Sequence, residues 1–519
     1  MLDHYEFDRK NFNAAVGTRE FPADSAATDA HVDYLFGYLN NDELDAKMIV
    51  VEHDYVDGDF LQDFASYYVS CHTPYERYCK RLHFFSEYVP RAQFEAIIAG
   101  EAKPKHVRRL RKTYLGFIVI KPLPDAIIGR TQLKTYGDDH GRRHYDALVD
   151  YDVHLFGVSL RVRSLAFQEQ DQALAACATV ALWSCFQKTS RLFGTPAPRP
   201  PKITMDATMS FFDQRALPSS YLYVEQICSA IRQNGLDPEV YGAAACAEAP
   251  VASLIYAHVR MGLPVLLIMQ VEELGQHAVT ISGYSLREQP IHANESPYGN
   301  APPLIGRRID EFYAHDDQQG PFSRLLFFAP TCDHELPYFE GKWKRDDGTA
   351  RRLTPTQIVI PVYQKIRLPY LKALDWVNRI NLPIQVIARA LDYGELEWDA
   401  HLTTTNDYKK QIRKARTLAR RRLEYLLTEQ QPRFFWRFAA MRGNKIVCEL
   451  LVDATGFTKS FPLMAINFYD ERFATRLAAI APYASDRLSK PYRILIAREF
   501  RNRQGPPTKM PAPTAGEGA

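Results

Sequence analysis

The chain has 519 residues, 46% hydrophobic and 24% charged, an ordinary globular composition that excludes a wholly disordered protein and suggests about three domains. Its 64 basic and 61 acidic residues nearly cancel, so no overall charge directs it toward a polyanionic partner. The sequence has neither a basic leader nor an apolar run of about 20 residues, so we expect a cytoplasmic protein without a membrane span.

Residues 1–155 predict an N-terminal α+β domain that we cannot assign to a family. Asp57 is placed to cap a helix whose aromatic residues recur at the helical period as far as Cys71. An apolar strand follows at residues 114–120, directly after a basic run at residues 103–112. Such a run is typical of a solvated helix face, and phosphate or nucleic-acid binding is the less favoured interpretation.

Cysteine and histidine occur near one another in this domain, at Cys71, His72, Cys79 and His83. Their spacing fits no tetrahedral zinc pattern. The eight cysteines of the chain are scattered and form no disulfide framework. We therefore expect no metal and no other cofactor, and we interpret most of the cysteines as small buried hydrophobes.

The central third, residues 156–335, places a cysteine at the start of a predicted helix. After a polar stretch that includes Gln170 and Gln172, apolar residues recur on one helical face from Cys177 onward. The N–H groups and dipole of a helix N-terminus favour the thiolate, which is the nucleophilic form of cysteine. Gln170 or Gln172 is placed to donate an amide hydrogen to the oxygen of an attacked carbonyl.

Other elements of this third are predicted from apolar runs and turn residues. Two strands are expected at residues 155–160 and 162–167, leading to the cysteine helix. The four prolines of residues 194–201 predict a loop without helix. Helices are expected at residues 222–234 and 251–261, closed by Gly235 and Gly262.

Two further polar residues are candidates for the same site. His277 stands near the start of an apolar strand that follows the buried strand ending at Met269, and Asp316 lies farther along the chain, shortly before Gly320. A cysteine, a histidine and an aspartate on separate elements can meet in one cleft, as in the catalytic triads of several unrelated folds.

These segments resemble the papain-like cysteine peptidase superfamily, most closely its bacterial branch of double-glycine leader peptidases and their relatives. The resemblance covers about residues 160–335 and rests on residues 167–186, 217–236, 262–284 and 312–321. It implies a helix carrying Cys177 packed on an antiparallel sheet that carries His277 and Asp316, with Asp316 preferred to Asp317. The expected fold class is thus α+β, a papain-like domain between two other α+β domains.

The chain departs from that family at two places. Ala176 and Ala178 flank the cysteine, where the family usually has glycine. Asp171 stands where the family's glutamine commonly lies, with Gln170 and Gln172 on either side. The choice between these two glutamines stays open.

Residues 345–505 predict a C-terminal α+β domain, with a strand at residues 357–363 and a basic helix at residues 408–427. The cations considered for polyanion contact are Lys409, Lys410, Arg413, Arg416 and Arg420. A solvated or ion-paired face is the preferred interpretation, and contact with nucleic acid or an acidic partner is the alternative. Residues 506–519 are rich in proline, glycine and alanine and are expected to be disordered.

The sequence therefore predicts a cytoplasmic cysteine hydrolase, a peptidase or isopeptidase that forms an acyl-enzyme intermediate on a peptide or protein substrate. Three alternatives stay open. The same residues could serve a transglutaminase-type acyl transfer, or the fold could be an inactive peptidase that binds peptides. The third is a regulatory scaffold whose basic helix binds a polyanion.

Overall fold

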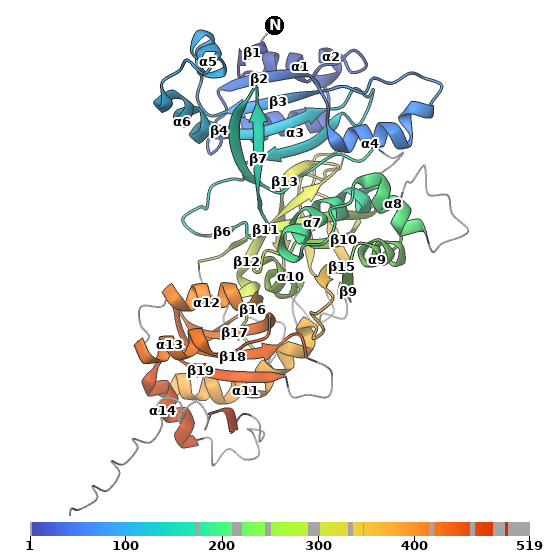
Figure 1. Ribbon diagram of the computed structural model, residues 1–519. Helices are drawn as coiled ribbons and strands as arrows, with labels where there is room; N and C mark the ends of the chain where they lie inside the picture. Colours follow the sequence, from blue (N-terminus) through green and yellow to red (C-terminus); the bar gives the residue numbers. More distant parts are fainter. Residues whose placement is uncertain are drawn as a thin grey trace, which may run out of the picture. The chain divides into compact units, whose positions relative to one another are not determined.

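The computed structural model describes residues 3–171, 176–209, 221–243, 251–288, 302–330, 336–345, 347–414, 420–456, 462–480, 492 and 494–496. The chain forms two compact units, one of Met1–Gln289 with Arg308–Gln364 and one of Pro290–Arg307 with Lys365–Ala519. Each unit combines helices with antiparallel sheet, which confirms the α+β class (Figure 1). Among the described residues, no helix has both the length and the apolarity that crossing a bilayer requires.

The first unit begins with a five-stranded sheet in the order β1-β2-β3-β4-β5. The strands are β1 Asp3–Glu6, β2 Met48–Tyr55, β3 Cys79–Phe85, β4 Tyr114–Ile120 and β5 Ile128–Leu133. The helices are α1 Arg9–Val16, α2 Ala23–Ala26, α3 Ala30–Leu39, α4 Gly58–Ser66, α5 Arg91–Ile98 and α6 Pro104–Thr113. As predicted, the Asp57 side chain caps α4 by accepting hydrogen bonds from the N–H groups of Asp59 and Phe60.

A hairpin of β7 Val149–Leu155 and β8 Val158–Ser164 follows, so the strands expected at residues 155–160 and 162–167 are wrongly placed. The turn falls at Phe156 and Gly157, which both have positive φ angles of 47° and 83°. A two-residue hairpin turn requires such angles, and phenylalanine rarely adopts them. Of the two turn residues, only Gly157 is of a type that indicates such a turn in a sequence.

An eight-stranded sheet forms the rest of the first unit, in the order β10-β11-β12-β13-β14-β15-β9, with an additional pairing of β10 with β15. Its strands are β6 Arg143–His144, β9 Leu236–Gly242, β10 Val265–Val271, β11 Gly275–Leu286, β12 Ile309–Asp316, β13 Gly320–Phe328, β14 Tyr338–Glu340 and β15 Leu353–Tyr363. Strand β6 joins it by pairing with β11.

Strand β15 corrects the predicted domain organisation. We assigned residues 357–363 to the C-terminal domain, but β15 pairs with β10 and β9 of the central sheet. The contact boundary accordingly lies after Gln364, and the predicted N-terminal and central domains share one compact unit. Strand β10 is almost wholly buried, and its neighbour β15 supplies the hydrogen bonds of one edge.

Four helices accompany this sheet: α7 Cys177–Phe193, α8 Pro200–Thr208, α9 Val224–Gln233 and α10 Val251–Val259. The expectation that residues 194–201 exclude helix is wrong at its end, because Pro200 and Pro201 open α8. Proline at the first positions of a helix sacrifices no intrahelical hydrogen bond.

The second unit holds a four-stranded antiparallel sheet, β16-β17-β18-β19. Its elements are α11 Tyr370–Ala390, β16 Glu397–Thr404, α12 Thr405–Lys414, α13 Arg420–Thr428, β17 Phe434–Arg442, β18 Lys445–Asp453, β19 Leu463–Phe468 and α14 Glu471–Ile480 (Figure 1). The basic helix predicted at residues 408–427 corresponds to α12 and α13, with residues 415–419 outside the described part. The predicted disordered tail also lies outside it.

Candidate active site

Cys177 is the first residue of α7 and is half-buried. Ala176 stands in the capping position with extended backbone and offers no side-chain acceptor to the helix. Further along, α7 is fixed to strand β11, where the Thr280 hydroxyl donates to the Ala181 carbonyl at 2.7 Å. The thiol therefore sits at an uncapped helix N-terminus, an environment that favours a negative charge.

His277 lies on β11 and Asp316 is the last residue of the adjacent strand β12. Nε2 of His277 is 2.9 Å from Oδ1 of Asp316. The Asp316 carboxylate is fully buried, and it also accepts hydrogen bonds from the Gln318 backbone N–H at 3.0 Å and from the Trp343 indole at 2.9 Å. Three donors thus replace the water that this carboxylate loses on burial.

The two charges hold each other in the ionised form. Burial by itself would lower the pKa of His277, but the adjacent Asp316 carboxylate outweighs it and raises that pKa well above its ordinary value. Burial by itself would raise the pKa of Asp316, but His277 and the other hydrogen-bond donors bring it below its ordinary value. The arrangement favours an imidazolium beside a carboxylate.

The Cys177 thiol completes the cluster: besides Asp316, it contributes to raising the pKa of His277 and so favours the protonated imidazole. Nε2 faces Asp316, which leaves Nδ1 as the nitrogen open to the thiol. The three residues that the sequence singled out, Cys177, His277 and Asp316, thus lie in one connected group.

Trp343 is a member of the site that the sequence did not reveal. Its ring lies edge-on to His277, with ring centroids 5.0 Å apart, while its Nε1 hydrogen reaches Asp316. It lies after β14, in a stretch that we placed between two predicted domains. Nothing in the residues around it signals a contact with β12.

Asp317 is a second carboxylate beside the imidazole, with Oδ1 3.6 Å from Nε2 of His277. Neither of its carboxylate oxygens has a hydrogen-bond partner among the described residues, and burial raises its pKa to about 7. His277, Asp316 and Asp317 each offer a ligand atom within 4.8 Å, close enough to surround a divalent cation. The three hydrogen bonds to Asp316 already engage both of its oxygens, which favours the hydrogen-bonded arrangement over a metal.

The two glutamines considered for the oxyanion site are only partly placed. Gln170 is half-buried in the extended segment beyond Phe167, which pairs with Thr131. Gln172 lies outside the described residues. The Asp171 carboxylate, at the position where a glutamine was expected, accepts a hydrogen bond from the Tyr68 hydroxyl at 3.0 Å.

The basic residues of α12 and α13 mostly contact their own chain. The Lys409 ammonium donates to the Glu429 carbonyl, Lys410 pairs with Asp407, and Arg420 pairs with Glu424. Arg413 is exposed, and Arg416 lies outside the described residues. These contacts are those expected of an ion-paired helix face.

Comparison with known proteins provides no relative from which a role could be transferred. No protein-family model, no curated protein and no solved structure matches the chain. The resemblance to papain-like peptidases therefore stays an expectation drawn from its motifs, and functional conclusions depend on the site's own geometry.

Proposed function

We propose that this protein is a cysteine hydrolase that cleaves a peptide or isopeptide bond, with Cys177 as the nucleophile. The observation that supports it is the convergence of Cys177, His277 and Asp316 from α7, β11 and β12. A half-buried thiol beside a histidine, which is itself oriented by a buried carboxylate, is the arrangement that activates a nucleophile for acyl transfer.

The proposed reaction uses each group in turn. The Cys177 thiolate attacks the carbonyl carbon, and the bond to the leaving nitrogen breaks as His277 passes its proton to that nitrogen. His277 then takes a proton from water, whose oxygen attacks the thioester and releases the acid with a free thiolate. Asp316 remains ionised and stabilises the imidazolium throughout.

The oxyanion of the tetrahedral intermediate needs hydrogen-bond donors near the start of α7. The backbone N–H of Cys177 and the Gln170 amide are the proposed donors, with Gln172 as the second candidate. In this proposal, α7 and the eight-stranded sheet form a papain-like domain.

Site-specific alkylation tests the nucleophile. Iodoacetamide should modify Cys177 rapidly at pH 6, where a free thiol of pKa about 8.5 is almost wholly protonated. Cys185 is the internal control, because burial raises its pKa to about 12. His277→Ala should abolish the advantage of Cys177. Labelling of Cys177 no faster than that of half-buried Cys71, and unchanged in His277→Ala, would remove the basis for the proposal.

The same acyl-enzyme could pass its acyl group to an amine, which makes a transglutaminase-type transferase the second candidate. An activated acyl ester should first leave an acyl group on Cys177, detectable by intact mass. The acyl-enzyme is then offered water alone or water with a primary amine. A hydrolase releases mainly the acid, whereas a transferase forms mainly the amide.

Two non-enzymatic alternatives predict no acyl-enzyme. A peptidase-like binding protein would retain peptides without acylation of Cys177. A regulatory scaffold would use α12 and α13 to bind a polyanion, with an affinity that falls steeply with salt. The internal contacts of Lys409, Lys410 and Arg420 give this last alternative little support.

A further inference from the structure

Helix α3 lies against the turn that joins β12 to β13, next to the end of the strand that carries Asp316. Nε2 of His31 lies 2.8 Å from the Asp317 carbonyl oxygen, and the Tyr34 hydroxyl donates to the Pro321 carbonyl at 2.7 Å. A carbonyl can only accept, so the His31 Nε2 carries the hydrogen. Two side chains one helical turn apart therefore bind the backbone on both sides of the turn.

His31 is itself held by a buried acid. Its Nδ1 lies 3.2 Å from Oε1 of Glu169, and both side chains are largely buried, at 15% and 12% exposed. The other Glu169 oxygen accepts the Ile128 N–H at 3.1 Å, and the Glu169 N–H donates to the Ile128 carbonyl at 3.0 Å. The imidazole is thus fixed between a rigid strand edge and the turn.

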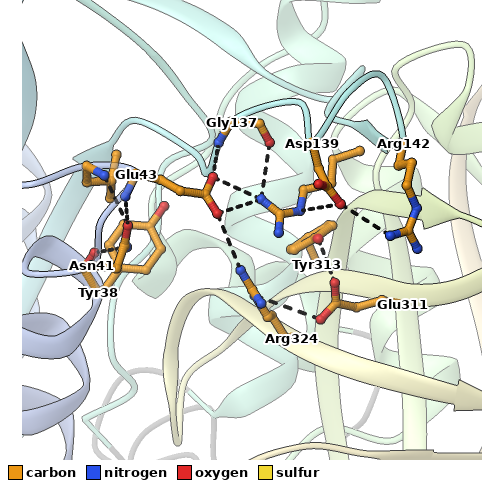
Figure 2. Close-up of polar contacts among 11 residues, drawn as sticks. Tyr38, Asn41, Glu43, Gly137, Asp139, Arg142, Glu311, Tyr313 and Arg324 are labelled. Atoms are coloured by element: carbon orange, nitrogen blue, oxygen red, sulfur yellow. Dashed lines mark hydrogen bonds and ion pairs between the residues drawn. The ribbon is translucent and has the colours of Figure 1, made fainter.

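Beyond the C-terminal end of α3, a second anchor holds the chain to the same sheet. Figure 2 shows Glu43, just past α3, accepting the Gly137 N–H and facing Arg324 on β13. Arg324 in turn pairs with Glu311 on β12, at 3.8 Å. These contacts tie α3 and the segment that follows it to the β12–β13 turn and to β13.

The turn leaves no free space between α3 and the sheet. Gly320 has a φ angle of 150°, and a Cβ atom built there would stand 2.3 Å from the Tyr34 ring. Within the turn, the Gln319 N–H donates to the Asp316 carbonyl at 3.0 Å. A displacement of α3 would therefore move the backbone that carries Asp316.

We infer that His31 is a positioning residue of the proposed active site, which holds the Asp316–Asp317 backbone in place and thereby keeps the Asp316 carboxylate against His277. This inference rests on the proposed function. It makes the N-terminal segment a structural part of the catalytic apparatus, because the pairing on which Cys177 depends is completed by a helix some 280 residues earlier in sequence.

The test measures the rate of Cys177 alkylation by iodoacetamide from pH 5 to pH 9, in the full-length protein. His31→Ala should slow labelling at pH 6 about tenfold, toward the rate of Asp316→Asn, because a misplaced carboxylate no longer stabilises the imidazolium. His31→Gln keeps an N–H donor for the carbonyl and should stay within about threefold of the wild type. In an Asp316→Asn background, His31→Ala should not slow the labelling of Cys177 any further, because His31 acts through Asp316.

Asp33→Asn is the matched control on the same helix, since it removes the Arg9–Asp33 ion pair and the attraction of Asp33 for Lys342 but neither of the hydrogen bonds from His31 and Tyr34, and it should label as the wild type does. Wild-type rates in His31→Ala, together with slow labelling in Asp316→Asn, would overturn the inference and leave the proposed function standing. Slow labelling already in the wild type would overturn the proposed function itself, and the inference with it. If His31→Ala does not fold, Glu169→Ala replaces it and should label more slowly than His31→Gln; equal rates would overturn the inference.

Discussion

The imidazole of His277 faces two neighbouring carboxylates that differ in their hydrogen bonding. Its Nε2 lies 2.9 Å from Oδ1 of Asp316 and 3.6 Å from Oδ1 of Asp317. Asp316 receives hydrogen bonds from three donors, whereas the Asp317 carboxylate has no hydrogen-bond partner among the described residues. The pKa of Asp316 is accordingly lowered, and that of Asp317 is raised to about 7 by its burial. Adjacent residues in sequence thus acquire different charges near neutral pH.

Asp317→Asn should stabilise the protein above neutral pH. Because the pKa of Asp317 is higher in the folded state than its ordinary 3.8, the folded protein binds this proton more tightly than the unfolded chain. The wild type therefore loses stability as the pH rises from about 4 through about 7, and an uncharged amide escapes this loss. Urea unfolding should show an advantage of Asp317→Asn over the wild type that grows by about 1 kcal/mol or more between pH 5 and pH 8. An equal effect at both pH values would contradict the charge on Asp317.

Asp316→Asn should move the alkylation profile of Cys177 to more alkaline pH. The Asp316 carboxylate raises the pKa of His277, so the imidazolium persists through neutral pH in the wild type. Without that charge, burial dominates and lowers the pKa of His277, and the thiol loses its cationic partner. The rate at pH 6 should fall at least about tenfold while the rate at pH 9 changes little. A uniform reduction across the whole range would instead indicate a change in access to the thiol.

Trp343→Phe should slow the labelling of Cys177 without removing the aromatic ring beside His277. The substitution retains a ring beside His277 but removes the indole hydrogen that Asp316 accepts. Loss of one donor to a buried carboxylate should cost about 1–3 kcal/mol and slow Cys177 labelling at pH 6.

Trp436→Phe provides the comparison for Trp343→Phe. Its indole donates to the Leu368 carbonyl at 2.8 Å within the second unit. Trp436→Phe should reduce the stability of the protein, because it also removes an indole hydrogen bond, but it should leave the labelling of Cys177 unchanged. If both substitutions slow the labelling equally, the effect comes from general destabilisation.

Gly320→Ala should be strongly destabilising, because the added methyl group would collide with the Tyr34 ring and the residue would keep a positive φ. We expect a loss of about 2–4 kcal/mol in the free energy of unfolding. Combining it with Tyr34→Ala removes the collision but not the backbone strain, so the two changes should cost less together than their sum. Strict additivity in this double-mutant cycle would show that the turn and α3 are not in contact.

Local sequence signals located many of the elements. The strand at residues 114–120 was predicted with the bounds that β4 has, and the cap at Asp57 and the helix start at Cys177 were placed correctly. Each depends on side chains within a few residues of the backbone that they affect. The same reasoning failed at Phe156, whose backbone adopts a turn conformation that its residue type disfavours.

The sequence by itself determined a cysteine at a helix start and a histidine near a strand start, because periodicity and turn residues encode these local features, whereas Asp316 was singled out by the resemblance of its segment to papain-like peptidases. Tertiary structure alone decided how far Asp316 and Asp317 lie from His277, that Trp343 reaches Asp316, and that His31 contacts their turn. It also moved β15 from the predicted C-terminal domain into the central sheet. The physical reason is that these contacts join residues far apart in sequence, and their geometry depends on strand register and helix packing, which no short stretch of residues specifies.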